Sequence, residues 1–181
     1  MQDEERIARG LQKGDPEAWS RVYEGYFTKI YRYIAIRVGN NTEAEDLAEQ
    51  VFLKALESSS SFKWRGAPVS AWLFRIAHNQ VIDYWRRTKS KTPLPLGEYL
   101  PSNGVDPEEE AERNVNMREV VQAMDQLTHA QRDVIELRFA GGLSVAEVAK
   151  VLGKSEGAVK VMQHSALLAL RKRLQSRSDN E

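Results

Sequence analysis

Cationic side chains are concentrated near the carboxyl end of the chain. Residues 150–177 contain seven lysines and arginines and a single acidic residue, Glu156. A local excess of positive charge of this kind suits contact with the phosphate backbone of a nucleic acid. This segment is therefore the first candidate for binding chemistry.

The helices expected to position these cations form a compact pattern. Ser144 and Glu147 have the spacing of a capping box, which predicts a helix over residues 144–152. Gly153 is suited to end that helix, and Ser155 to cap a second, longer one. A three-residue turn containing glycine is typical of a helix-turn-helix, whose second helix commonly lies in the major groove. Spacing alone leaves a plain helical hairpin open, whereas the charge favours DNA.

A second candidate is an aromatic and basic loop at residues 58–70. Phe62 and Trp64 alternate there with Lys63 and Arg65. Rings that stack on bases, next to cations that contact the backbone, are the chemistry of single-stranded nucleic acid binding. The alternative is that both rings fasten the loop to the core.

The composition argues against catalysis, metal binding and membrane insertion. The chain has three histidines and no cysteine, and it contains no P-loop or metal-binding cluster. We therefore expect no enzyme activity, no cofactor and no metal. A chain without cysteine fits a reducing compartment, no apolar run approaches the ~20 residues of a membrane span, and the acidic start lacks a signal-peptide core. We expect a soluble, cytoplasmic protein.

Capping and apolar spacing predict an all-α chain of two small helical domains. The first, residues 1–91, should hold helices over 3–13, 15–38, 42–57 and 69–91, with Thr42 and Glu45 as a capping box. A flexible linker rich in proline and glycine follows at 92–106. The second domain, residues 107–181, should begin with a helix to Leu127, continue with a helix capped by Thr128, and end in the helix-turn-helix.

Charge is distributed in blocks although the net charge is zero. Residues 54–91 carry eight basic and two acidic side chains, and residues 92–125 carry two basic and eight acidic ones. This pattern predicts two surfaces that face nucleic acid, separated by a segment that avoids it.

Helical periodicity also assigns faces. The stripe from Trp19 through Tyr23 to Val38 is expected to be core, as is Phe139. In the helix over 42–57, Phe52 is expected to point outward among carboxylates, which favours a protein partner. His78 has no second ligand at metal-binding spacing, so a surface or DNA-contacting imidazole is expected.

Three motifs in this order resemble the extracytoplasmic-function sigma factors of the bacterial sigma-70 family. They are EDLAEQVFLKAL at 45–56, AWLFRIAHNQVIDYWRR at 71–87 and LSVAEVAKVLGKSEGAVKV at 143–161. The resemblance implies a subunit that binds core RNA polymerase, recognises the minus-35 and minus-ten promoter elements, and promotes strand opening for transcription initiation. It also implies contacts with the clamp and flap regions of the polymerase, and an anti-sigma factor that holds the protein.

The resemblance assigns roles residue by residue. Core polymerase would be bound by Asp46, Leu47, Glu49, Gln50 and Phe52. Minus-ten DNA would be bound by Phe62, Lys63, Trp64, Arg65, Arg75, His78, Asn79, Asp83, Arg86 and Arg87, with Asn79 holding a flipped base. Minus-35 DNA would be bound by Ser155, Glu156, Lys160, Gln163, His164, Arg171 and Arg173. Family members often have an arginine near Ser165, so this chain departs from the pattern there.

Two other functions remain compatible with the residues. A stand-alone helix-turn-helix transcriptional regulator would bind duplex DNA as a dimer, but it would not need the motifs at 45–56 and 71–87. An inactive relative would chiefly bind other proteins.

Overall fold

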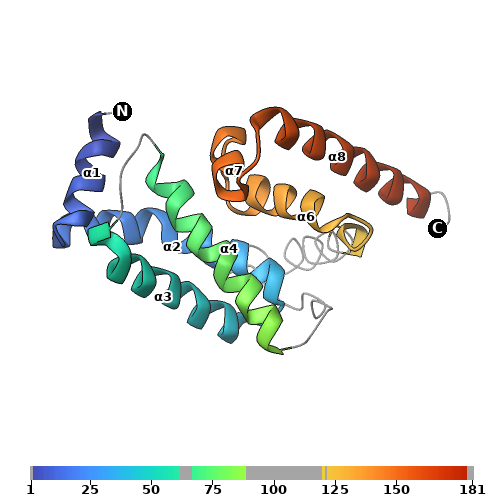
Figure 1. The fold of residues 1–181 in the computed structure, drawn as a ribbon. Coiled ribbons are helices and arrows are strands. Elements are labelled where there is room, and N and C mark those ends of the chain that lie inside the picture. The colour runs from blue at the N-terminus through green and yellow to red at the C-terminus, as the bar shows by residue number, and fades with distance from the viewer. Residues whose placement is uncertain (1, 62–66, 89–119, 121, 179–181) are drawn as a thin grey trace, which may run out of the picture.

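The computed structural model describes residues 2–61, 67–88, 120 and 122–178, and every regular element in these ranges is a helix. Figure 1 shows α1 to α4 together at one side and α6 to α8 at the other, with α7 beside α4. The prediction of an all-α chain with two domains is confirmed for the described residues. The predicted linker at 92–106 lies outside them, as does most of the helix expected from residue 107.

The first two helices are α1 (Gln2–Gln12) and α2 (Pro16–Val38). The Asp15 side chain caps α2 by accepting a hydrogen bond from the Glu17 amide at 3.1 Å, and Pro16 occupies the first turn. At the other end, Gly39 has φ 72°, the left-handed conformation that lets a glycine close a helix. Both ends of α2 are where the sequence predicted them.

The next elements are α3 (Asn41–Ser58) and a short 3-10 turn, η1 (Ser59–Ser61). The predicted capping box of Thr42 and Glu45 is wrong. Asn40 is the cap, because its extended backbone lets its side-chain oxygen accept from the Glu43 amide at 3.1 Å. Asparagine is at least as strong a cap as threonine, and the cap lies two residues earlier than expected.

The remaining helices are α4 (Val69–Thr88), α6 (His129–Ile135), η2 (Glu136–Ala140), α7 (Val145–Leu152) and α8 (Glu156–Ser178). Thr128 caps α6 as predicted, and Gln131 completes a capping box with it. The segment η2 is a π-helix, whose wider turn moves the following side chains around the helix axis. Phe139 is consequently 61% exposed, so its prediction as a core residue is wrong.

Packing in the first domain centres on α2, α3 and α4, whose facing side chains are buried. Gly10 lets α1 approach α2 closely, since a Cβ at this position would lie 2.6 Å from the Cβ of Ala18. The buried face of α4 includes Leu73, Phe74 and Gln80. The amide of Gln80 is satisfied there, because its oxygen accepts from Lys54 Nζ at 2.7 Å.

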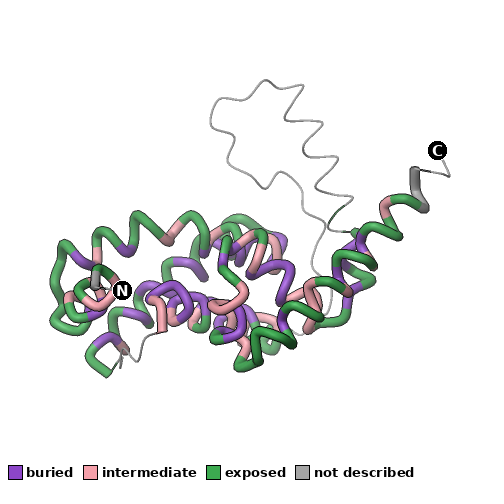
Figure 2. Tube along the Cα trace, turned by 90° about the horizontal axis from the view of Figure 1, so that it is seen from above, coloured by how far each residue is buried: buried purple, intermediate pink, exposed green. Residues whose placement is uncertain are grey.

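The apolar core continues from the first domain into the second. Val134, Leu137, Val148 and Val159 belong to the same buried cluster as the side chains of α2 to α4. Figure 2 shows buried stretches, in purple, on helices of both domains. A smaller cluster lies beneath α8, where Ala166 and Leu170 meet Met124, Leu127, Ile135 and Ala123. The two domains therefore pack together in this structure.

Candidate nucleic-acid and partner interfaces

The helix-turn-helix forms at the predicted residues. The Ser144 hydroxyl accepts from the Glu147 amide at 3.2 Å, and Glu147 accepts from the Ser144 amide at 2.7 Å. Gly153 ends α7 with φ 63°, and the amide of Ala158 donates to the Ser155 hydroxyl at 3.1 Å to begin α8. The pKa of Glu147 is lowered because hydrogen bonds from Ser144 and Ser70 outweigh the opposite effect of its burial. An ionised carboxylate therefore holds the α7 cap.

One face of α8 is buried and the opposite face is exposed. Val159 and Ala166 are fully buried. Most of the residues expected at minus-35 DNA are exposed, namely Ser155, Glu156, Lys160, His164, Arg171 and Arg173. A helix that is anchored on one side and cationic on the other can contact a groove of duplex DNA.

Gln163 differs from the other residues predicted to contact minus-35 DNA. Its side chain is half-buried, and its oxygen accepts from Arg138 Nε at 2.9 Å. Arg138 also donates to the carbonyl of Leu143. Gln163 therefore helps to hold α8 against η2 and the turn that follows it. A base contact by Gln163 stays a prediction, and it would require this hydrogen bond to be shared or broken.

Ser165, near which the resemblance led us to expect an arginine, serves packing in this structure. Its hydroxyl donates to the Met162 carbonyl at 3.1 Å and accepts from Gln131 Nε2 at 2.9 Å. Gln131 is also the reciprocal residue of the α6 capping box. Ser165 therefore connects α8 to the start of α6.

The residues of α4 expected at minus-ten DNA divide into two groups. Asn79, Arg86 and Arg87 are exposed, and Asp83 accepts from Arg86 at 2.8 Å. Arg75 instead donates to the Lys150 carbonyl in α7, where the two domains meet. The rest of the predicted set, Phe62, Lys63, Trp64 and Arg65, lies outside the described residues.

His78 is half-buried and its ring contacts α2, so it is not freely exposed as a surface imidazole would be, and its contact with DNA stays a prediction. Its Nδ1 is 3.0 Å from the hydroxyl of Tyr33, which accepts from Arg37 at 3.2 Å. Burial lowers the pKa of His78; the Asp133 carboxylate opposes this shift and the Arg37 charge adds to it. A neutral imidazole is therefore favoured, with Nδ1 accepting from Tyr33.

A buried ion cluster joins α2 to the second domain, and the sequence analysis did not find it. Arg37 lies 2.5 Å from Asp133 and 3.0 Å from Glu136, and Arg132 donates to Glu136 at 2.9 Å. Glu136 is only 2% exposed, and burial raises its pKa despite the two arginines. The sequence did contain one indication of this cluster. Glu136 lies in the mostly apolar segment VIELRF, and a carboxylate buried there needs a cation as its partner.

An open apolar groove of about 590 Å³ lies between α2 and α3. Tyr23, Leu53 and Leu56 are the exposed apolar side chains of its lining, at 43%, 59% and 50% exposure. The lining is completed by Pro16, Trp19, Ser20, Glu49 and Phe52. Among the exposed side chains, Tyr23 was predicted to face the core, and that prediction is wrong. An unpartnered apolar groove beside acidic side chains is typical of a protein-binding surface.

Two residues predicted at the polymerase contact lie beneath that surface. Phe52 is 8% exposed and packs on Tyr23, with a ring-centroid distance of 4.9 Å, and on Phe27 at 6.0 Å. Its prediction as an outward residue is wrong because α2 supplies aromatic rings that cover it. Leu47 is 3% exposed. Asp46, Glu49 and Gln50 are exposed, so they are the members of the predicted set that a partner could touch.

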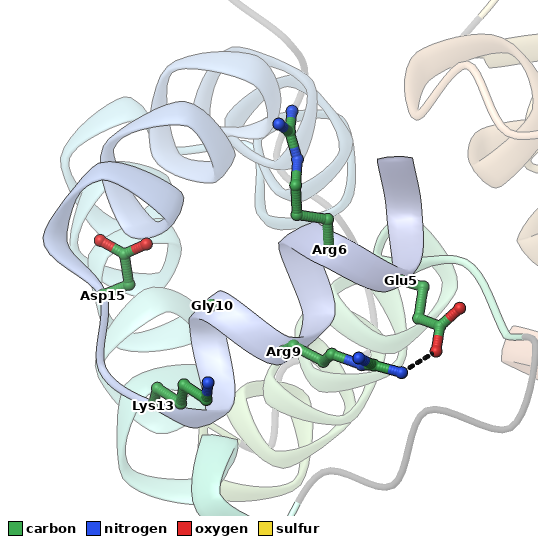
Figure 3. Close-up of a pocket in the computed structure, with 6 residues that line it drawn as sticks. All are labelled: Glu5, Arg6, Arg9, Gly10, Lys13 and Asp15. Atoms are coloured by element: carbon green, nitrogen blue, oxygen red, sulfur yellow. Dashed lines mark hydrogen bonds and ion pairs between the residues drawn. The ribbon is translucent and has the colours of Figure 1, made fainter. Parts of the chain in front are cut away.

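A polar hollow of about 390 Å³ lies where α1 meets the turn into α2 (Figure 3). Its arginines are already paired along α1: Arg9 with Glu5 at 2.5 Å and Arg6 with Asp3 at 2.8 Å. The described residues contain no group of histidine and carboxylate side chains that could hold a metal ion. None of the described helices has the length and apolar character to cross a membrane.

Comparison with known proteins identifies the two domains. Residues 22–91 match the family model of Sigma-70 region 2, and residues 123–172 match that of Sigma-70 region 4. The chain is 38% identical over 166 residues to the ECF RNA polymerase sigma factor BldN of Streptomyces coelicolor, covering 91% of this chain and 63% of that protein. It is 33% identical over 165 residues to the ECF RNA polymerase sigma factor SigX of Bacillus subtilis, covering 88% and 84%.

The fold has a solved counterpart in CnrH, whose structure is known in complex with the cytosolic domain of CnrY. The TM-score is 0.70 at 21% identity, and the match covers 96% of this chain and 97% of CnrH. These relatives do not favour a stand-alone regulator. Because both regions match in their expected order and SigX is matched over most of its length, the chain belongs to the extracytoplasmic-function group of the sigma-70 family of RNA polymerase sigma factors.

Proposed function

We propose that this protein directs core RNA polymerase to promoters by contacting minus-35 DNA through α8 and minus-ten DNA through α4. The observation that carries the proposal is the cationic, exposed face of α8, presented by a capped helix-turn-helix. The protein contributes binding and strand opening and no covalent chemistry. Its place of action is the cytoplasm, where the polymerase works.

At the minus-35 element, Lys160 and His164 lie on the exposed face in the first turns of α8, where a recognition helix contacts base edges. Arg171 and Arg173 lie farther along the helix and contact phosphates. Ser155 and Glu156 begin the helix, where the Ser155 hydroxyl is already engaged as the cap. Phosphate contacts set the register of α8, and the first turns provide sequence preference.

At the minus-ten element, Asn79 hydrogen-bonds an extruded base, and Arg86 and Arg87 contact the backbone of the opened strand. These side chains are exposed on α4. Extruding a base costs a few kcal/mol, which hydrogen bonding to Asn79 and stacking on Phe62 and Trp64 offset. Arg75 can turn to DNA when it releases the Lys150 carbonyl of α7, and His78 when it releases the Tyr33 hydroxyl of α2.

Core polymerase binds the surface formed by α2 and α3. A helix of the clamp places apolar side chains against Leu53, Leu56 and Tyr23, which are exposed along the groove. Asp46, Glu49 and Gln50 give polar contacts at its rim, a layout typical of protein interfaces. Phe52 and Leu47 shape this surface from beneath. The flap region and an anti-sigma factor are further proposed partners.

Run-off transcription tests the proposal. Promoters are selected from a random DNA library with holoenzyme reconstituted from core polymerase and this protein. RNA with a discrete start should then appear only when both components are present. The absence of stimulated transcription on every selected or genomic template would contradict the proposal. Gel filtration separates the alternative, since a sigma factor co-elutes with core polymerase and a stand-alone regulator elutes as a free dimer.

A further inference from the structure

One residue of α8 stands out among the polar side chains of its exposed face. Val161 is 69% exposed, the largest exposed fraction of any large apolar side chain that the structure describes. It follows Lys160 directly and lies one turn before His164 and Ser165. It therefore lies between the side chains proposed to contact minus-35 DNA. Its methyl groups cannot form hydrogen bonds with base edges or phosphates.

The neighbourhood of Val161 leaves it accessible toward the start of the helix. Side chains in a helix lean toward the preceding turn, so Val161 extends over the position four residues earlier. That position is Gly157, which is exposed and has no side chain. The nearest atom to a Cβ placed at Gly157 would be the Ser155 hydroxyl, at 3.9 Å. Val161 can thus approach a surface that lies against the first turns of α8.

We propose that Val161 contacts the 5-methyl group of a thymine in the minus-35 duplex and so selects T·A at one position. The inference rests on the proposed function and adds the base class that this residue recognises. The thymine methyl is the apolar group that base pairs present in the major groove, and valine offers only apolar contact. Adenine, guanine and cytosine have no such group, so each would leave Val161 against polar edges.

The adjacent residues fit this arrangement. Lys160 and His164 lie on either side of Val161 along the exposed face and supply the polar contacts that set its depth in the groove. Leu168, which is 54% exposed, follows seven residues later, about 10 Å along the axis. It lies beyond the first turns that a recognition helix places against bases. A protein bound along both Val161 and Leu168 is the competing explanation.

The test removes single methyl groups from DNA. Holoenzyme binding is measured on a selected promoter in which each thymine of the minus-35 element is replaced in turn by deoxyuridine. For the unaltered protein, one replacement should weaken binding about fourfold, the equivalent of about 0.8 kcal/mol for one buried methyl group. Val161→Ser should bind the unmodified promoter about fourfold more weakly and lose nothing further at that same position.

Leu167→Ser is the matched control, because Leu167 is also an exposed apolar residue of α8, at 41%. It should retain the full response to deoxyuridine. Thermal unfolding should show both variants folded, since serine differs from valine and from leucine by less than about 0.7 kcal/mol in helix propensity and both sites are exposed. Two results would overturn the inference about Val161 and leave the proposed function intact. One is a minus-35 element without thymine, and the other is an equal response to deoxyuridine from the unaltered protein and from Val161→Ser. If Val161→Ser lost core-polymerase binding while its response to deoxyuridine stayed unchanged, the inference would also fail, and Val161 would instead contact a protein. Holoenzyme that transcribes from no template would instead overturn the proposed function.

Discussion

Arg37, Tyr33 and His78 form a hydrogen-bonded chain from α2 to α4, and its geometry decides where the protons lie. Arg37 donates to the Tyr33 oxygen, and burial raises the pKa of Tyr33, so its hydroxyl keeps its proton. That proton is available to His78 Nδ1, 3.0 Å away. The chain therefore favours the neutral form of His78.

The protonation of His78 should make stability depend on pH. Its folded pKa lies below its ordinary value of 6.5, so between these two values the unfolded chain binds a proton that the folded chain excludes. The contribution of His78 to stability is therefore complete above about pH 6.5 and is lost as pH falls through that window. Urea unfolding at pH 7.5 and pH 5.5 should show a larger loss for the unaltered protein than for His78→Gln.

The pKa of Glu136 shifts in the opposite direction, because burial raises it above its ordinary value of 4.5. The contribution of Glu136 to stability is therefore lost as pH rises above 4.5. It is present in both proteins, so the difference between them isolates His78. Asp133 and Arg37 also face the imidazole, and they too are common to both. An identical pH dependence in the two proteins would contradict the assignment.

Asn79 tests strand opening at the level of a single residue. It is exposed on α4, so Asn79→Ala should leave stability within about 0.5 kcal/mol of the original value. Loss of one hydrogen bond to an extruded base should reduce open complexes about tenfold, an effect of about 1.4 kcal/mol. Permanganate footprinting measures the opened strand. Gln126→Ala, an exposed amide in the other domain, should have no effect, and an equal loss in both variants would exclude a specific role for Asn79.

Two adjacent residues of α3 have different roles. Phe52 contributes to stability, and Leu53 is proposed to bind a partner. Phe52→Ala removes a buried ring from contact with Tyr23 and Phe27, so it should lower the free energy of unfolding by about 3 kcal/mol. Leu53 is 59% exposed, so Leu53→Ala should change that free energy by at most about 0.5 kcal/mol.

Binding to core polymerase should separate the same two variants in the other direction. Leu53→Ala removes exposed apolar surface from the groove and should weaken the complex about tenfold, as expected for an interface anchor. Urea unfolding and fluorescence titration with core polymerase give the two quantities. A Leu53→Ala protein with unaltered affinity would show that the clamp does not bind in the groove between α2 and α3.

At the scale of the whole molecule, the packing of the two domains depends on a glycine. Gly141 meets α4 so closely that an added Cβ would lie 2.7 Å from the Phe74 ring and 2.8 Å from the Leu137 carbonyl. Gly141→Ala should therefore cost about 1–3 kcal/mol by overpacking, and it should separate the domains. Small-angle scattering should record a larger radius of gyration with the helix content unchanged.

Gly25→Ala is the control for that substitution. Gly25 lies within α2, and nothing comes within 4 Å of a Cβ placed there. Alanine should raise the free energy of unfolding by about 0.5–1 kcal/mol through its better helix propensity, without changing the radius. A Gly141→Ala protein as compact and as stable as the Gly25→Ala protein would refute the role of the close contact.

Local sequence determined most of the helices and their ends, because capping and glycine stops act within a few residues. Ser144 and Gly153 have the predicted roles, α2 has the predicted ends, and α7 and α8 form a helix-turn-helix where the pattern placed it. The exposed positions of Lys160, His164 and Arg171 also follow from helical periodicity, since Val159 and Ala166 define the opposite face. These features need no information about distant parts of the chain.

Only the tertiary structure decided which faces are covered by other elements. Tyr23 and Phe27 of α2 cover Phe52, and Tyr33 of α2 reaches His78 of α4, so two residues read as outward are packed. Arg37 and Asp133 pair across 96 residues, and no local pattern encodes that distance. Periodicity tells which residues share a face of a helix, whereas burial depends on what packs against that face. The interface between the domains, and the groove left open between α2 and α3, are therefore properties of the folded molecule.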